Sequence, residues 1–394
     1  MKKILDYDEM KELLDSLDNN IIKKEEPIGF SNFGYPIDHY TYGNGEYHMI
    51  ITSGTHSSEL ITNIFVIRFM EKLSLKEIYI DPNKYTIHFI PFVNPEGTII
   101  VTKAIRSLIG KNISWDAEQT YCLTFYRNCR IEGIYSNSLE NHDVKLEQWM
   151  FRRATPDILG EEHKDLKMSL KKLYEDNDLP IGSMINWSSN GRGVDLNSNL
   201  ESSTFIDRIE KGEAIYSKLH LGNIRRDKLG PLGCPYYEKK GDIEPENKAL
   251  YNFYESIKNN HKLIGSLIYH SCGDIIMYND DLTFKNPWQE DFDSKDTFKN
   301  KIVAEKYASI TGYKLDKSEI YTTVDAKLKT LYPVSLLIEL GSVTGTPLSQ
   351  FLDLDIPGSG VGFKNVYTNI IEKNSKAILE VLPLMADIYE VNYE

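Results

Sequence analysis

The sequence lacks the features that mark membrane-spanning, secreted and nucleic-acid-binding proteins. Its 394 residues contain no run of eighteen apolar residues, which excludes a transmembrane helix. The first nine residues include two lysines but no apolar segment of the length that a secretory signal needs. A formal net charge of −13 argues against nucleic acid or an anionic membrane as the main partner. We therefore expect a cytoplasmic protein with neither of these partners.

Cysteine is also scarce, and its spacing excludes two further classes. The four cysteines form no Cys-x-x-Cys pair and no disulfide framework, so neither a zinc ribbon nor a disulfide-stapled secreted fold is expected. The glycine-rich segment 357–362 lacks the Gly-Lys-Ser/Thr ending of a phosphate-binding loop, which predicts an ordinary loop there. We expect reduced thiols at Cys122, Cys129, Cys234 and Cys272.

What the sequence does contain is a globular composition, 41% hydrophobic and 26% charged, and an alternation of strands with helices. This alternation predicts an α/β fold with a mixed, mostly parallel central sheet flanked by helices. We expect one domain over residues 1–394, with an N-terminal helix and strands in 1–45 and a polar insertion at about 104–186. Strands are predicted over 47–51, 85–92, 263–269 and 334–338, and helices over 6–17, 60–70, 161–176, 244–257, 294–311 and 364–390.

Two local signals refine this pattern. Asn44-Gly45 is a hairpin signal, which predicts a hairpin leading into the strand at 47–51. His88 alternates with apolar residues in the strand at 85–92, so a structural role is favoured over metal binding.

The segment 53–59 lies between a buried strand and an amphipathic helix. His56 follows the end of the strand, and Glu59 lies in the first turn of the helix. Because ligands of α/β sheets gather at the carboxyl ends of strands, this pair suits a zinc ion that needs nitrogen and oxygen donors. The alternative is a loop histidine and a glutamate that is favoured by the helix dipole.

Two later strands also end in a metal ligand or a base, His270 and Glu339. Two histidines and one glutamate form a catalytic zinc set that leaves a fourth position open for water. A further carboxylate is then needed as general base, and Glu339 is the candidate. A carboxylate at the end of an apolar strand costs desolvation energy unless it is paired or functional.

Together these residues resemble the zinc metallocarboxypeptidase family (funnelins, carboxypeptidase A-like). The resemblance implies an α/β sheet of about eight mixed strands, one zinc ion held by His56, Glu59 and His270, and Glu339 as general base and acid. It also implies a peptide substrate, over which Tyr321 closes. The matching segments occur in family order at 29–37, 54–59, 91–97, 193–197, 269–273, 320–321 and 338–341.

The resemblance extends to an arginine that stabilises the oxyanion. Arg192 is our choice, because Asn-x-Arg-Gly-Val-Asp-Leu-Asn resembles the bacterial cell-wall peptidases of the family. A surface-turn arginine is the alternative for Arg192. Four arginines of the polar insertion are the other candidates for the oxyanion role: Arg127, Arg130, Arg152 and Arg153.

The chain departs from the family pattern in its substrate pocket. Typical carboxypeptidases grip the terminal carboxylate of the substrate with an Asn-Arg pair, whereas this chain has Asn197-Ser198. Such a change resembles γ-D-glutamyl-diamino-acid peptidases, which implies a murein-derived peptide as substrate. Further pocket candidates are Val324, Asp325, Lys327 and Lys329.

Three other functions stay open at this point. The chain is an ordinary metallocarboxypeptidase if another cation replaces the missing arginine. It is a deacylase or amidohydrolase if the substrate is a small acylated amino acid. A non-catalytic zinc or peptide-binding module would require the loss of a ligand or base, and none is lost.

Overall fold

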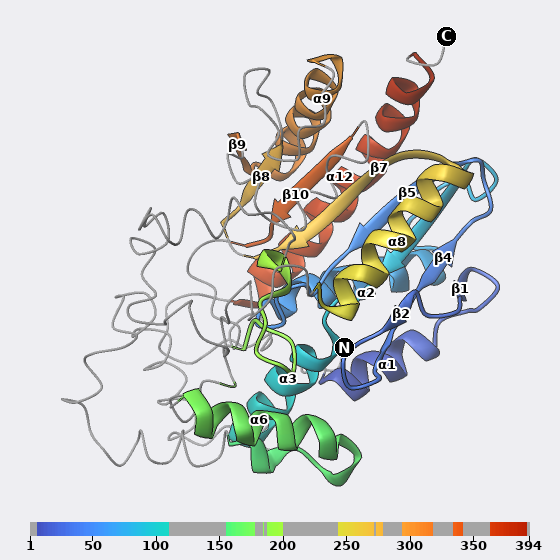
Figure 1. The fold of residues 1–394 in the computed structure, drawn as a ribbon. Coiled ribbons are helices and arrows are strands. Elements are labelled where there is room, and N and C mark those ends of the chain that lie inside the picture. Colours follow the sequence, from blue (N-terminus) through green and yellow to red (C-terminus); the bar gives the residue numbers. More distant parts are fainter. Residues whose placement is uncertain are drawn as a thin grey trace.

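The computed structural model describes residues 6–109, 155–177, 184, 187–199, 243–271, 273–278, 294–317, 334–341 and 363–391. Within them, eight strands form a central sheet in the order β1-β4-β6-β5-β7-β10-β8-β9, and β2 and β3 form a separate pair (Figure 1). The strands are β1 (Ile22–Lys24), β2 (Gly29–Phe30), β3 (Pro36–Ile37), β4 (Tyr40–Tyr42), β5 (Tyr47–Thr52), β6 (Tyr85–Ile90), β7 (Lys262–His270), β8 (Ile275–Tyr278), β9 (Lys314–Lys317) and β10 (Ser335–Glu339).

The sheet is mixed, which confirms the predicted fold class. Neighbouring pairs β6–β5, β5–β7, β7–β10 and β8–β9 are parallel, and the other three are antiparallel. The predicted hairpin at Asn44-Gly45 is wrong: β6 lies between β4 and β5 and pairs with both. The turn itself exists, but backbone hydrogen bonds from Asn44 to Pro82 and from Gly45 to Tyr85 bind it to the segment that enters β6. Long-range pairing therefore overrides the local turn signal.

Helices cover both faces of the sheet, and the alternation of side chains along each strand explains how. Ile50 of β5 packs in one apolar cluster with Leu250 and Tyr254 of α8, while Met49 and Ile51 join the larger cluster on the opposite face with α2, α9 and α12 (Figure 1). The helices are α1 (Tyr7–Asp15), α2 (Leu60–Ser74), α3 (Pro95–Ile109), α6 (Lys164–Asn177), α8 (Pro245–Asn260), α9 (Ser294–Thr311) and α12 (Phe363–Glu390).

Local sequence signals set where several helices begin. The Asp6 side chain accepts a hydrogen bond from the Glu9 amide at 2.9 Å, and the Glu9 carboxylate accepts one from the Asp6 amide at 3.1 Å. This capping box satisfies amide groups at the start of α1 that have no partner within the helix. Helix α8 begins at Pro245, whose ring favours the first helical position because no amide hydrogen bond is needed there.

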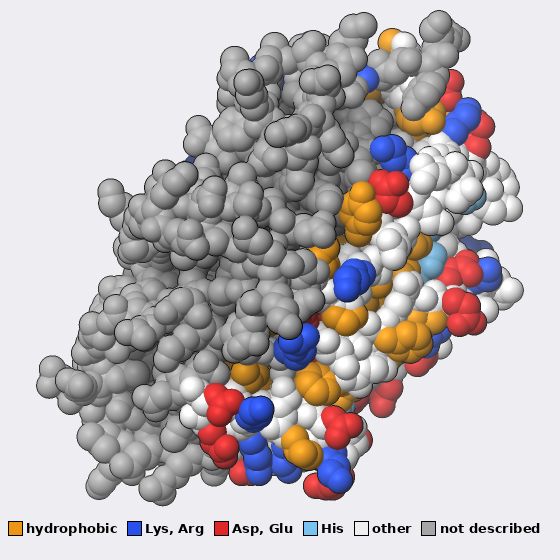
Figure 2. Space-filling model, viewed as in Figure 1, with side chains coloured by type: hydrophobic (Ala, Val, Ile, Leu, Met, Phe, Trp, Pro, Cys, Tyr) orange, Lys and Arg blue, Asp and Glu red, His pale blue; other side chains and the backbone are white. Residues whose placement is uncertain are grey.

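Charged side chains of both signs are interspersed on the described part of the face in Figure 2. Of the helices that the structure describes, none combines the length and apolarity that a membrane span requires. The four cysteines lie outside the described residues.

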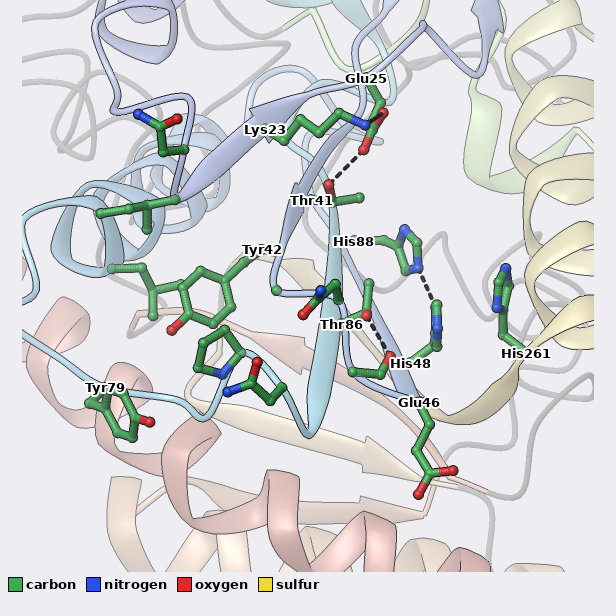
Figure 3. A pocket seen from close by; sticks show the side chains of 18 of the residues that line it. Lys23, Glu25, Thr41, Tyr42, Glu46, His48, Tyr79, Thr86, His88 and His261 are labelled. Carbon is green, nitrogen blue, oxygen red and sulfur yellow. Dashed lines mark hydrogen bonds and ion pairs between the residues drawn. The ribbon is translucent and has the colours of Figure 1, made fainter.

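A row of histidines lies toward the amino-terminal end of β5, beside a cleft of about 1220 Å³ (Figure 3). His88 Nδ1 is 3.0 Å from His39 Nε2, and His88 Nε2 is 2.8 Å from His48 Nδ1. His261 stacks on His48 with the ring centroids 4.0 Å apart. Both nitrogens of His88 are occupied by neighbouring imidazoles, which agrees with the structural role predicted for this residue.

These histidines should make the folded protein sensitive to acid. Burial lowers the pKa of His39 and His48 to about 4, while unfolded histidine titrates near its usual value of about 6.5. Below that value the unfolded chain binds protons that the folded chain does not, so stability falls as the pH falls toward about 4. We expect a loss of about 2 kcal/mol for each of the two histidines between about pH 7 and about pH 5.

Urea denaturation at the two pH values measures this loss. His48→Gln provides the comparison, because it removes one of the two histidines while the carboxylates that also titrate are unchanged. An equal pH dependence of the free energy of unfolding in wild type and variant would refute the assignment to the histidine row.

Candidate metal centre

The carboxyl ends of three neighbouring parallel strands meet at one edge of the sheet. Thr52, the last residue of β5, pairs with Ile268 of β7, and His270 at the end of β7 pairs with Glu339 at the end of β10. Beyond Thr52 the chain turns at Gly54, whose φ of +71° favours glycine, and carries His56 to this edge. The segment 53–59 is therefore directed toward His270, as the ends of parallel strands require.

Three side chains at this edge could hold a metal ion. Donor atoms of His56, Glu59 and His270 all lie within 4.8 Å of one another. His56 Nδ1 is 3.0 Å from Glu59 Oε1, and His270 Nδ1 is 3.0 Å from Glu59 Oε2. The two imidazoles meet edge to face with their centroids 4.9 Å apart. Two imidazole nitrogens and a carboxylate are a donor set that suits zinc, so these residues fit the metal.

The electrostatics of the three groups are those of a site that needs a cation. Burial lowers the pKa of His56, but the Glu59 and Asp195 carboxylates offset this and hold it well above the usual value. Burial also raises the pKa of Glu59, yet His56 and His270 offset it and bring the pKa below the usual range. A proton on His56 thus balances the carboxylates here, and a metal cation could take over that role.

Asp195 is a site residue that the sequence analysis did not single out. Its Oδ1 is 3.2 Å from His56 Nε2 and also accepts the Asn197 amide hydrogen bond at 3.0 Å. A carboxylate on the second ring nitrogen fixes the tautomer of a histidine and directs the other nitrogen toward a metal. In the sequence, Asp195 is marked only by the motif Gly193-Val194-Asp195-Leu196-Asn197. The spacing within this motif does not identify Asp195 as a partner of His56.

Two chain segments are joined around this contact. Ser58 Oγ and Ser188 Oγ are 2.6 Å apart, and Ser57 Oγ donates to the carbonyl of Trp187. Asn94 Nδ2 donates to the carbonyls of both Thr55 and Ser189. The segment that carries His56 and the segment that carries Asp195 are thus held together along their length.

Replacement of Asp195 should weaken metal binding without removal of a ligand. We expect Asp195→Ala to reduce zinc affinity by about 10- to 100-fold, because His56 loses the partner that orients its ring. Competition with a chromophoric chelator measures the affinity. An unchanged affinity would show that the contact between His56 and Asp195 does not support the metal centre.

The remaining predicted site residues divide by location. Glu339 is partly buried and lies beside His270 in the register of β7 and β10, so the two side chains leave the sheet on the same side. Arg192 Nη1 is 3.2 Å from Glu244 Oε1, and the Arg192 side chain is 46% exposed. Asn197 is buried in a short 3₁₀ helix, Leu196–Ser198, that Asp195 caps. The side chain of Ser198 lies outside the described part of the structure. So do the other candidates, which are Tyr321, Val324, Asp325, Lys327, Lys329, Arg127, Arg130, Arg152 and Arg153.

Comparison with solved structures finds a similar fold in two structures of thrombin-activatable fibrinolysis inhibitor. The chain is 14% identical to bovine thrombin-activatable fibrinolysis inhibitor, solved in complex with tick carboxypeptidase inhibitor. The match covers 97% of this chain and 94% of that one, with a TM-score of 0.52. A crystal structure of thrombin-activatable fibrinolysis inhibitor also matches at 14% identity over 97% of this chain and 73% of that one, with a TM-score of 0.53. At this identity the likeness concerns the fold.

A search of curated proteins finds no match. The family model for zinc carboxypeptidases, in contrast, matches residues 20–336, which include β5, β7 and the proposed metal ligands. This match covers well over half of the chain. The protein therefore belongs to the zinc carboxypeptidase family.

Proposed function

We propose that this zinc peptidase binds one zinc ion through His56, Glu59 and His270 and uses Glu339 as its general base. The observation that carries the proposal is the convergence of the two Nδ1 atoms on the Glu59 carboxylate, at the edge of the sheet where Glu339 ends β10. Family membership supports zinc as the metal and peptides as the substrates.

In this proposal the chemistry divides among few groups. Zinc, when bound, supplies Lewis acidity for the scissile carbonyl and the attacking water. Glu339 removes a proton from that water and donates it to the leaving amine. Arg192 stabilises the developing oxyanion; a guanidinium has five N–H donors, and the ion pair with Glu244 engages Nη1. Tyr321 closes over the bound substrate.

We further propose a murein-derived peptide as substrate, with cleavage at a γ-D-glutamyl-diamino-acid bond. The support lies in Asn197-Ser198, where a serine stands in place of the arginine that would grip a terminal carboxylate. A serine hydroxyl carries no positive charge, so recognition of a plain C-terminus lacks its usual cation. Asn197, Ser198 and Asp325 are the proposed substrate contacts.

The second candidate is a carboxypeptidase that releases C-terminal residues from ordinary peptides, which the description of the matching family favours. A single experiment separates the two. The zinc-loaded protein is incubated with L-Ala-γ-D-Glu-diaminopimelate, with a plain peptide and with its C-terminally amidated form, and the products are identified by mass spectrometry.

Cleavage of the γ-linked bond alone supports the murein peptidase. Release of residues from the plain peptide, but not from the amidated one, would overturn that substrate in favour of the carboxypeptidase.

A further inference from the structure

Three glutamates are buried behind the segment that carries Asp195. Glu96 at the start of α3 and Glu246 at the start of α8 are fully buried, and Glu244, which precedes α8, is 3% exposed. Carboxylates are rarely buried to this degree unless they are paired. Their position therefore requires an explanation in terms of the groups that they contact.

Glu96 and Glu244 contact Phe33 and Asn32, respectively, and both contact the loop at 190–194. Glu96 Oε2 accepts a hydrogen bond from the Gly191 amide at 2.8 Å. Glu244 Oε2 accepts one from Asn190 Nδ2 at 2.7 Å, and Glu244 Oε1 pairs with Arg192. Among the described residues, the one group whose donors converge as a metal site is that of His56, Glu59 and His270.

Asn190 connects the Glu244 carboxylate to the backbone of the loop. The Asn190 Oδ1 accepts hydrogen bonds from the backbone amides of Arg192 at 3.0 Å and Val194 at 3.1 Å. The backbone amide of Asn190 donates to the carbonyl of Val194 at 2.9 Å. Gly193 has a φ of +77°, which the tight turn requires. Because Val194 directly precedes Asp195, this turn fixes the position of the Asp195 backbone, from which the carboxylate extends.

We propose that Asn190, Glu96 and Glu244 form a buried clamp that positions Asp195 against His56 and thereby tunes the affinity of the metal centre. None of the three is a proposed zinc ligand, and each acts through the loop at 190–195. The inference rests on the proposed function in one respect, that His56 binds zinc.

Glu246 provides a control within the same cluster. It is as buried as Glu96, but its contacts with the two side-chain amides are long, 3.5 Å from Asn190 Nδ2 and 3.4 Å from Asn32 Nδ2. Burial, together with the charges of Glu96 and Glu244, raises its pKa to about 8, so it is protonated at neutral pH. Glu246→Gln therefore replaces a neutral acid by a neutral amide of the same shape and should change zinc affinity less than about twofold.

The test is a double-mutant cycle on zinc affinity, measured by chelator competition on folded protein. Asn190→Ala in the wild-type background should weaken zinc binding about tenfold. In the Asp195→Ala background the same substitution should have almost no effect, since the clamp acts through Asp195. If Asn190→Ala does not fold, Asn190→Asp keeps the Oδ1 acceptor of the turn and places a charge against Glu244, so the same cycle can be run.

The outcomes separate this inference from the proposed function. If wild-type protein binds no zinc, the proposed function fails. If it binds zinc but the two substitutions are additive, or if Glu246→Gln weakens zinc binding as much as Asn190→Ala, the clamp is overturned while the zinc peptidase stands. A tenfold effect that disappears in the Asp195→Ala background supports the clamp.

Discussion

Glu339→Gln should abolish most peptidase activity while the protein stays folded and retains its zinc. We expect kcat to fall by about 10²- to 10⁴-fold, the usual contribution of a positioned general base. The amide keeps the shape of the side chain at the end of β10 but cannot accept a proton from water at neutral pH. Initial rates on the peptide that the wild type cleaves, with zinc content from atomic absorption, measure the effect.

A carboxylate directly after β1 provides the control. Glu25 accepts a hydrogen bond from Thr41 at 2.8 Å, beside the cleft and away from the metal centre. Glu25→Gln removes one carboxylate charge in the same way and should leave kcat unchanged. Full activity of the Glu339→Gln protein at full zinc occupancy would remove Glu339 from the mechanism.

His270→Gln should abolish zinc binding in the measurable range, and activity with it. The substitution removes the imidazole of one of the three proposed ligands. Glu59 Oε2 then keeps the hydrogen bond from the Ser271 amide, at 3.0 Å. Zinc that binds only the folded state stabilises it by about 2.7 kcal/mol at a hundredfold excess over the dissociation constant. We expect this stabilisation in the wild type and its absence in the variant.

His88→Gln is the matched control for this experiment. His88 is a second buried histidine of the same sheet, in β6, with both ring nitrogens close to other imidazoles. Its replacement should lower the stability of the apo-protein but leave the zinc-dependent increase in melting temperature. An equal increase in wild-type and His270→Gln protein would contradict the assignment of His270 as a ligand.

The sequence was informative wherever short-range spacing controls structure. The predicted strands near 47–51, 85–92, 263–269 and 334–338 all occur, because continuous apolar runs bounded by polar turns have little alternative in a covered sheet. The carboxyl end of a parallel strand can also be located from the sequence. The proximity of His56 and Glu59 to His270 could therefore be anticipated from two separate segments.

Where the decisive interaction is long-range, the sequence misled or was silent. The hairpin at Asn44-Gly45 failed because β6, more than forty residues later, takes the place beside β5. Arg192 was identified by its motif, but nothing in the motif indicates that Glu244 pairs with its guanidinium across 52 positions. The short strands β8 and β9 were missed because a run of four residues, apolar in β8 and mostly charged in β9, is too short to show a periodicity.

By itself, then, the sequence determined the fold class and the identity of the proposed ligands, since both depend on local periodicity and on which residues follow each strand. The tertiary structure decided which groups support those ligands. Asp195 reaches His56 across 139 positions, and Glu96 reaches the loop at Gly191 across 95. Such contacts depend on how loops and helix starts pack after the sheet has formed, and no spacing within one segment encodes them.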